Sequence, residues 1–229
     1  MRSLMALLFI GGLGFLLLVL TGLLPFGEPP MIVGSGIQAA TPGELRTANM
    51  VTAVVLGYRG IDTLGELSIL FAAATAGGLV LGKHHLQKHQ TEAGFVLKAG
   101  ADLLLPLLLL VGAYIILHGH LTPGGGFQGG VILAAALFLP VLARPSQTIS
   151  HAWMSVIEGF AGASFILIGV WAMYGGGEFL QPLLDKGVMG ELVSGGTLPL
   201  LYLAVGLKVG AELAGLLSRL AEQPEGEAS

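Results

Sequence analysis

Long apolar stretches separated by short polar segments dominate this chain of 229 residues. A helix needs about 18 to 20 predominantly apolar residues to cross a bilayer. Six stretches fit that requirement, the fourth together with its glycine-rich approach, and they are Leu4–Leu24, Thr63–Leu81, Ala101–Leu117, Val131–Ala143, Val156–Tyr174 and Leu198–Leu217. The pattern therefore predicts an all-α polytopic membrane protein with about six transmembrane helices.

The first stretch, Leu4–Leu24, also has the position of a secretory signal peptide. Its apolar run is longer than the core of a typical signal peptide, and no small-residue cleavage site precedes Pro25. We therefore expect this stretch to remain as a membrane span.

A shorter apolar stretch, Thr47–Gly57, has only about 11 residues and is too short to span alone. The polar break Tyr58–Asp62 follows it. We expect an outer interfacial or re-entrant half-helix that leads into the second span. A continuous bent helix is the alternative.

Basic residues orient the predicted spans, because cytoplasmic loops carry an excess of lysine and arginine. With the N-terminus inside, the outer loops hold only Arg46, Arg59 and Lys186, and the outer loop 175–195 is acidic. Six spans then place both termini in the cytoplasm and the chain in the plasma membrane. The inner segments hold Arg2, Lys83, Lys88, Lys98, Arg144 and Arg219.

Composition agrees with a membrane protein and excludes several kinds of site. Apolar residues make up 54% of the chain and charged residues 10%, whereas a soluble domain has about 25% charged residues. The net charge of −4 gives no reason to expect a nucleic-acid partner. Because there is no cysteine, disulfides and thiolate metal sites are absent.

Ionisable residues inside a membrane are costly, so they are candidates for function. Asp62 and Glu66 are four residues apart and share one helical face near Arg59. Two such carboxylates can bind or relay a cation. The alternative is an outer helix end at which Asp62 caps the helix and Arg59 pairs with Glu66.

The last predicted span contains a second charged pair, Lys208 and Glu212, again four residues apart. The pair suits a proton path, or a neutralised contact with a neighbouring subunit. Gly206 and Gly210 indicate close helix packing in the same span. Glu158 is expected to be an interfacial carboxylate near the inner end of the fifth span, and a relay group is the alternative.

The connection between the third and fourth spans has the densest local pattern. It contains His118 and His120 and then Pro123, Gly124, Gly125, Gly126, Phe127, Gly129 and Gly130. Glycine permits positive φ and close backbone approach. The segment fits a re-entrant turn that lines a cavity, or a tight hairpin whose glycines let two helices meet.

No pattern in the chain indicates an enzyme, a metal site or a cofactor. No nucleophile with a general base, nucleotide fingerprint or haem motif is visible. His84, His85 and His89 lie beside lysines in a polar linker, where solvated side chains are more common than a metal site. We expect no catalytic residue and no resident metal.

Two parts of the chain resemble a known family of membrane complexes. The string His118–Gly130 and the segment Gly206–Glu212 resemble the B subunit of Mrp-type multisubunit sodium/proton antiporters, the MnhB family, over about residues 95–218. The string Asn49–Glu66 resembles the C-terminal helix pair of the Mrp A subunit, which is a separate small subunit in related membrane-bound hydrogenases. The implied organisation is a two-helix unit at 1–82, a polar cytoplasmic linker at 83–97, a four-helix MnhB-like domain at 98–218 and a polar tail at 219–229.

The resemblance implies a non-catalytic subunit that helps to form the cation path of a sodium/proton antiporter. Its partners would be large antiporter-like subunits, membrane lipid, sodium ions and protons. The alternatives are a membrane-arm subunit of a redox-driven respiratory complex, or a structural scaffold between larger subunits. The path residues implied by the matching motifs are Arg59, Asp62, Glu66, His118, His120, Lys208 and Glu212.

Overall fold

The computed structural model describes residues 2–23, 31–81, 93–144, 149–174 and 177–221. Every regular element in these ranges is helical, as the apolar pattern predicts. The linker histidines His84, His85 and His89 and the tail residues 222–229 lie outside the described residues. The elements are α1 (Arg2–Leu23), α2 (Ile32–Glu44), α3 (Met50–Thr52), the π-helix η1 (Ala53–Tyr58), α4 (Gly60–Leu81), α5 (Phe95–Leu117), α6 (Gly126–Ala143), α7 (His151–Tyr174) and α8 (Leu198–Ala221).

The chain divides into two compact units, Met1–Gly36 and Ile37–Ser229. This division falls before the predicted boundary at residue 82, so α4 belongs to the same compact unit as α5 to α8. The four segments into which the resemblance divides the chain stay predictions. The first unit contains α1, whose apolar segment Ser3–Leu23 has a mean hydropathy of 2.6 and is long enough to cross a membrane.

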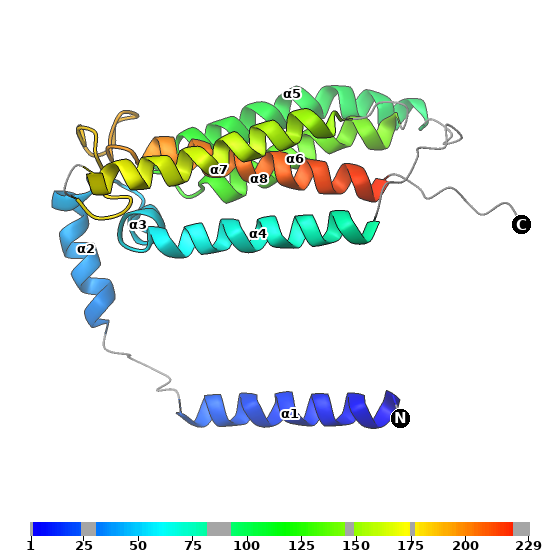
Figure 1. The fold of residues 1–229 in the computed structure, drawn as a ribbon, viewed down its shortest axis with the longest axis horizontal. Helices are drawn as coiled ribbons and strands as arrows, with labels where there is room; N and C mark the ends of the chain where they lie inside the picture. Colours follow the sequence, from blue (N-terminus) through cyan, green and yellow to red (C-terminus); the bar gives the residue numbers. More distant parts are fainter. Residues whose placement is uncertain (1, 24–30, 82–92, 145–148, 175–176, 222–229) are drawn as a thin grey trace, which may run out of the picture. The chain divides into compact units, whose positions relative to one another are not determined.

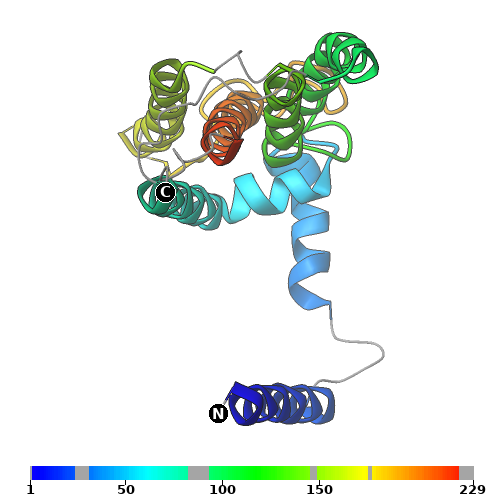
Figure 2. The same cartoon turned by 90° about the vertical axis from the view of Figure 1, so that its right-hand side faces the viewer.

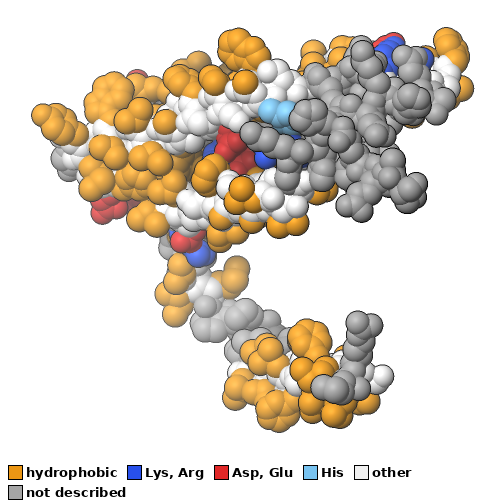
Figure 3. Space-filling view, turned by 45° about the vertical axis from the view of Figure 1, so that its right-hand side comes forward, with side chains coloured by type: hydrophobic (Ala, Val, Ile, Leu, Met, Phe, Trp, Pro, Cys, Tyr) orange, Lys and Arg blue, Asp and Glu red, His pale blue; other side chains and the backbone are white. Residues whose placement is uncertain are grey.

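Six helices are long and apolar enough to span a bilayer, which confirms the predicted number within the described residues. They are α1, α4, α5, α6, α7 and α8. On the face drawn in Figure 3, hydrophobic side chains predominate and charged side chains form only small groups. Such an apolar exterior suits lipid or neighbouring subunits, because soluble proteins rarely expose large apolar patches.

In the second unit, α8 is the central helix. Figures 1 and 2 show α4, α6 and α7 arranged around it, with α5 on the far side of α6. In α8, 67% of the span is buried within the chain, whereas the share in α4 is 11%. The core therefore follows α8, and most of the other helices turn an apolar face outward.

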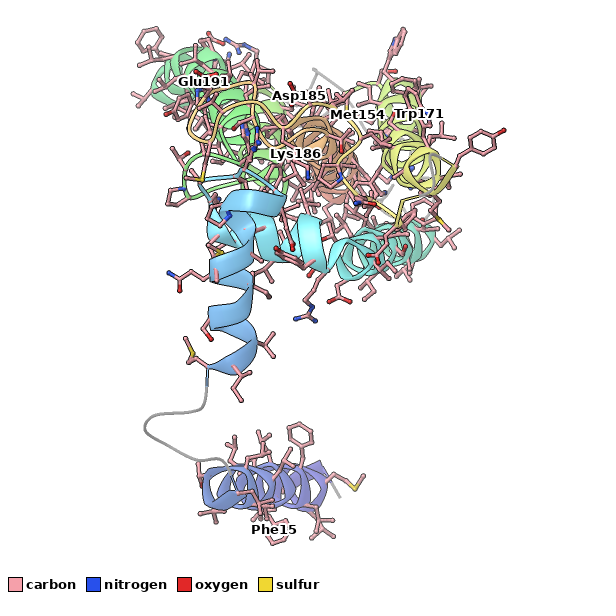
Figure 4. The ribbon with its side chains drawn as sticks, turned by 90° about the vertical axis from the view of Figure 1, so that its left-hand side faces the viewer. Phe15, Met154, Trp171, Asp185, Lys186 and Glu191 are labelled. Carbon is pink, nitrogen blue, oxygen red and sulfur yellow. The ribbon has the colours of Figure 1, made fainter. Side chains whose placement is uncertain are left out.

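The connections of the second unit meet at two ends of the bundle. At one end, Asn49 contacts the α5–α6 connection and Leu180 packs on Gly60. Figure 4 views this end, where Asp185, Lys186 and Glu191 lie in the loop before α8. At the other end Arg144 binds Asp102 through two hydrogen bonds of 2.8 and 2.7 Å. The loops predicted to lie outside the membrane thus meet at one end of the bundle, and those predicted to lie in the cytoplasm meet at the other.

The short apolar stretch before α4 forms a half-helix of its own. Asn49 caps its start by accepting a hydrogen bond of 3.0 Å from the amide of Val51. The helix ends at Arg59, whose φ of −127° and ψ of 34° leave the helical region before α4 begins. The alternative of a continuous bent helix is therefore wrong.

One helix, α2, was not predicted from the apolar pattern. Gly34, Gly36 and Pro42 lie within its 13 residues, and glycine and proline are the poorest helix formers. The segment is also too short to span a bilayer. Hydropathy periodicity therefore gave no signal for it.

The glycines of α6 let it approach two helices closely, as the tight-hairpin interpretation of the glycine string requires. A methyl group on Gly129 would lie 2.8 Å from the carbonyl oxygen of Gly112 in α5. One on Gly130 would lie 2.9 Å from the carbonyl oxygen of Gly206 in α8. Gly125, just before α6, has a φ of 141° and packs against the ring of Tyr202.

Replacing Gly130 by alanine is expected to separate α6 from α8. The added methyl would lie 2.8 Å from Cβ of Val209 as well as against backbone, and overpacking of this kind costs about 1–3 kcal/mol. The midpoint of thermal unfolding of the detergent-solubilised protein should fall. Gly159→Ala is the matched control, since nothing lies within 4 Å of that position; equal effects of the two variants would contradict the close contact.

Candidate functional site

The carbonyl groups of the α5–α6 connection are held by polar side chains from the segment before α4. Asn49 donates through Nδ2 to the carbonyl oxygens of Gly119 at 2.7 Å and Thr122 at 2.8 Å. The backbone N–H of Asn49 donates to the carbonyl oxygen of His120 at 3.1 Å. These bonds join the segment that resembles part of the Mrp A subunit to the loop that resembles the MnhB family.

Two threonines extend this polar contact into the core. Thr47 donates its hydroxyl to the carbonyl of His120, and Thr52 donates to that of Gly119 at 2.7 Å. The hydroxyls of Thr52 and Tyr202 lie 2.7 Å apart. Since all three side chains are buried, the carbonyls of Gly119 and His120 are satisfied by protein in the interior of the second unit.

The two histidines of the loop have different surroundings. His118 ends α5, stacks on Tyr114 with ring centroids 4.1 Å apart, and places Nδ1 3.0 Å from the carbonyl oxygen of Tyr114. His120 is fully buried, and neither ring nitrogen has a hydrogen-bond partner among the described residues.

Burial lowers the pKa of His120 below its ordinary value. The backbone of Glu191 and Leu192 lies near the ring, outside good hydrogen-bond geometry, and offsets part of this shift. Burial therefore favours the neutral imidazole form of His120.

Glu66 lines an otherwise largely apolar cavity in the second unit. The cavity has a volume of ≈ 180 Å³ and lies between η1, α4, α6 and α8. Its other lining residues are Val51, Val55, Leu56, Thr63, Gly124, Phe127, Gln128, Tyr202 and Val205. Phe127 and Gly124 of the glycine string thus reach the same cavity as Glu66.

The helix-end alternative for the acidic pair is wrong in both of its contacts, whereas the cation-binding interpretation of Asp62 and Glu66 stays a prediction. Arg59 forms an ion pair with Asp62 rather than with Glu66. Asp62 lies in the first turn of α4 and is not its cap, because α4 begins at Gly60. The Arg59–Asp62 pair is exposed at the helix end, which leaves Glu66 as the carboxylate that reaches the cavity.

Lys208 and Glu212 form a buried ion pair inside the second unit, with Nζ 3.0 Å from Oε2. The pair faces α4 and α7 of the same chain, because Lys208 Nζ lies 5.1 Å from the centre of the Phe71 ring and 3.6 Å from Oε1 of Glu158. A contact with a neighbouring subunit is therefore the wrong interpretation. Gly206 and Gly210 lie on the opposite face of α8 and pack on α5 and α6.

Sequence reasoning missed the inward position of Glu158. We expected an interfacial carboxylate, but its side chain is 19% exposed and lies beside Lys208. The only signal available was its depth of about two turns within an apolar helix. Asn49, Thr47 and Thr52 were also missed, since short polar side chains give no warning of which distant carbonyls they bind.

Replacing Asn49 by leucine is expected to loosen the α5–α6 connection. The change removes the side-chain donor of the Thr122 carbonyl and one of the two donors of the Gly119 carbonyl, which keeps Thr52. An unsatisfied buried group costs about 1–3 kcal/mol. The midpoint of thermal unfolding should fall. Ser68→Ala removes an exposed hydroxyl within α4 and should change it little; an unaltered midpoint in Asn49→Leu would contradict the role given to this contact.

Comparison with known proteins agrees with the expected family. The family described as a domain related to the MnhB subunit of Na+/H+ antiporters matches residues 96–215. An uncharacterized protein of Methanocaldococcus jannaschii is 33% identical over 196 residues, which are 73% of this chain and 74% of that protein. The B subunit of a Na+/H+ antiporter of Bacillus subtilis is 33% identical over 94 residues, which are 40% of this chain and 66% of that protein.

A solved structure matches nearly the whole chain. It is a chain of the membrane-bound sulfane sulfur reductase, an archaeal respiratory membrane complex, with a TM-score of 0.83 and 38% identity over 97% of this chain and 99% of that one. The fold is therefore shared beyond the MnhB-related region, and it includes the segment before α4. The chain belongs to the family related to the MnhB subunit of Na+/H+ antiporters, and it is a multi-pass membrane subunit of that type.

Proposed function

We propose that this chain helps to form the cation path of a multisubunit complex that exchanges sodium ions and protons. The observation that carries the proposal is the position of Glu66, whose carboxylate lines a largely apolar cavity between four helical elements. A carboxylate on a membrane-spanning helix is costly unless it binds a proton or a cation. The antiporter name of the matching family supports the same chemistry.

The remaining charged and histidine residues extend the proposed path. Arg59 and Asp62 form its outer end, where their exposed ion pair precedes the cavity. His118 and His120 border the loop whose glycines reach the cavity. Lys208 and Glu212 would continue the path toward the middle of the bundle, because they are charged, buried and held by α8.

The chain requires partners for this activity. Of the α4 span, only 11% is buried within the chain, and Glu66 is exposed in the isolated subunit. A large apolar face and an uncovered carboxylate suit contact with another membrane subunit. We infer that larger antiporter-like subunits cover this face and that lipid covers the rest.

A second candidate is the membrane arm of a redox-driven respiratory complex. It is favoured by the 38% identity to a chain of the sulfane sulfur reductase over 97% of this chain. In that setting the electron-transfer chemistry would lie in other subunits, while this chain would keep the same role in ion movement.

Purification of the tagged chain in mild detergent from its native membrane, followed by mass spectrometry, tests the assignment. Large antiporter-like subunits as the only companions would support a free-standing antiporter. Iron–sulfur or reductase subunits in the same preparation would support the redox-driven complex. A preparation of this chain without any companion would overturn both.

Replacing Glu66 by glutamine is expected to abolish sodium-dependent proton movement, because the amide neither carries the charge nor accepts the proton. The purified complex is reconstituted in vesicles and proton movement is followed after a sodium pulse. Assembly should be unchanged, because glutamine keeps the shape of Glu66 at the proposed partner face and Glu66 has no ion pair to lose within the described residues. The companions that purify with the variant check this. Glu178→Gln, an exposed loop change, is the control; full transport by the Glu66 variant would remove Glu66 from the path.

A further inference from the structure

Three ionisable groups meet where α4, α7 and α8 pack together. Lys208 Nζ lies 3.0 Å from Oε2 of Glu212 and 3.6 Å from Oε1 of Glu158. The side chains of Lys208, Glu212 and Glu158 are 9%, 1% and 19% exposed. Phe71 of α4 covers the ammonium group with its ring. We call these three ionisable residues the α8 cluster.

The cluster has unequal numbers of positive and negative groups. Two ionised carboxylates and one ammonium leave one net negative charge. In a medium of low dielectric constant an uncompensated charge is strongly unfavourable. Among the described residues, the ionisable side chains on the elements packed against α8 do not supply a further cation to the cluster.

The charges on α5 and α6 lie away from the cluster. Residues 126–143 of α6 contain no ionisable side chain. On α5, Lys98 lies in the first turn, one turn before Asp102, and Asp102 is paired with Arg144 at the bundle end. Neither helix therefore changes the charge balance of the cluster.

The charges on α4, α7 and the rest of α8 do not neutralise the cluster either. On α4 the carboxylates Asp62 and Glu66 add no positive charge. Arg219 of α8 lies three turns from Lys208 in sequence, beside Gly78. His151 begins α7 and lies about two turns from Glu158.

A second observation points to a missing proton. Oε1 of Glu212 is buried and has no hydrogen-bond partner among the described residues. A buried carboxylate oxygen without a donor loses its hydration and gains nothing in exchange. A proton on this oxygen removes the negative charge and makes the cluster neutral.

We propose that the α8 cluster is a buried proton-binding site in which Glu212 takes up one proton while Lys208 exchanges between Glu212 and Glu158. The proposal rests on the proposed function and gives Glu158 a place in the path. In the step, a hydronium ion transfers its proton to Oε1 of Glu212; one O–H bond of the hydronium ion breaks, one O–H bond forms at Oε1, and water leaves. The hydrogen bond from Nζ to Oε2 breaks, and Nζ donates to Oε1 of Glu158, so the ammonium keeps all its protons. Release reverses the two changes.

Gly162 leaves room for this movement. A methyl group at that position would lie 3.5 Å from Cδ and 3.7 Å from Cε of Lys208. The glycine of α7 therefore lies directly against the lysine stem, on the same helix as Glu158. Lys208 can reach the two carboxylates by rotating its flexible stem, without moving either helix.

Infrared difference spectroscopy of the purified native complex tests the site. Spectra of wild-type and variant complexes are compared near neutral pH, where exposed carboxylates are ionised because their pKa is about 4. Glu212→Gln is expected to lose a neutral carboxylic acid band that shifts in heavy water. Glu158→Gln should lose the same band. In that variant the Glu212 carboxylate and the Lys208 ammonium have no net charge together, so Glu212 no longer needs a proton.

Lys208→Met supplies a second measurement that does not depend on the glutamine variants folding. Two carboxylates without an ammonium should hold more protons, so the acid band should increase, by roughly twofold if both become neutral. Glu178→Gln is the control and should leave the band unchanged. A band that persists in Glu158→Gln overturns the proposal, since it would show that Glu212 is neutral for a reason unrelated to the shared charge.

The transport measurement separates this proposal from the proposed function. If the complex moves sodium ions and protons but Glu212→Gln loses only an ionised carboxylate band, the proton site is wrong and the proposed function stands. If the acid band behaves as expected and the complex transports neither ion, the buried proton is supported and the proposed function is contradicted.

Discussion

The binding of three loop carbonyls by Asn49, Thr47 and Thr52 holds together the parts of the second unit. A backbone carbonyl buried without a donor is destabilising by an amount that few contacts offset. Within this connection Thr122 donates to the carbonyl of His118. The carbonyls of Gly119, His120 and Thr122 receive their side-chain donors from a segment some 70 residues earlier in the chain. The segment before α4 and the MnhB-related region are therefore one structural unit, although each resembles a different subunit.

The central helix α8 uses its two faces in different ways. Gly206 and Gly210 on one face let α5 and α6 approach the backbone. Lys208 and Glu212 on the opposite face meet α4 and α7. Close glycine packing fixes the helix in place on one side, and a fixed helix is what a buried charged cluster on the other side requires.

Sequence predicted the spanning helices because each depends on a local property, the length of an apolar run. It also predicted the Lys208–Glu212 pair, since a spacing of four residues suffices in a helix. It failed for Glu158 and for the partner of Arg59, because both depend on which helices become neighbours or on where a helix begins. The polar contacts of Asn49 are equally non-local, and α2 was hidden by its glycines and proline.

The Glu66 cavity and the α8 cluster lie along the same interface between α4 and α8. Tyr202 and Val205 line the cavity, and Lys208 follows Val205 by three residues, an advance of about 4.5 Å along a helix. On α4, Phe71 follows Glu66 by five residues, or about 7.5 Å. Both helices advance from the same end of the bundle, so the two ionisable sites are successive positions along one seam. In the proposed path, the α8 cluster is therefore the next charged position after Glu66, about two helical turns further along the seam. The residues between them on the two helices are mostly apolar, so a proton or cation on that path needs water or a side chain to bridge the gap.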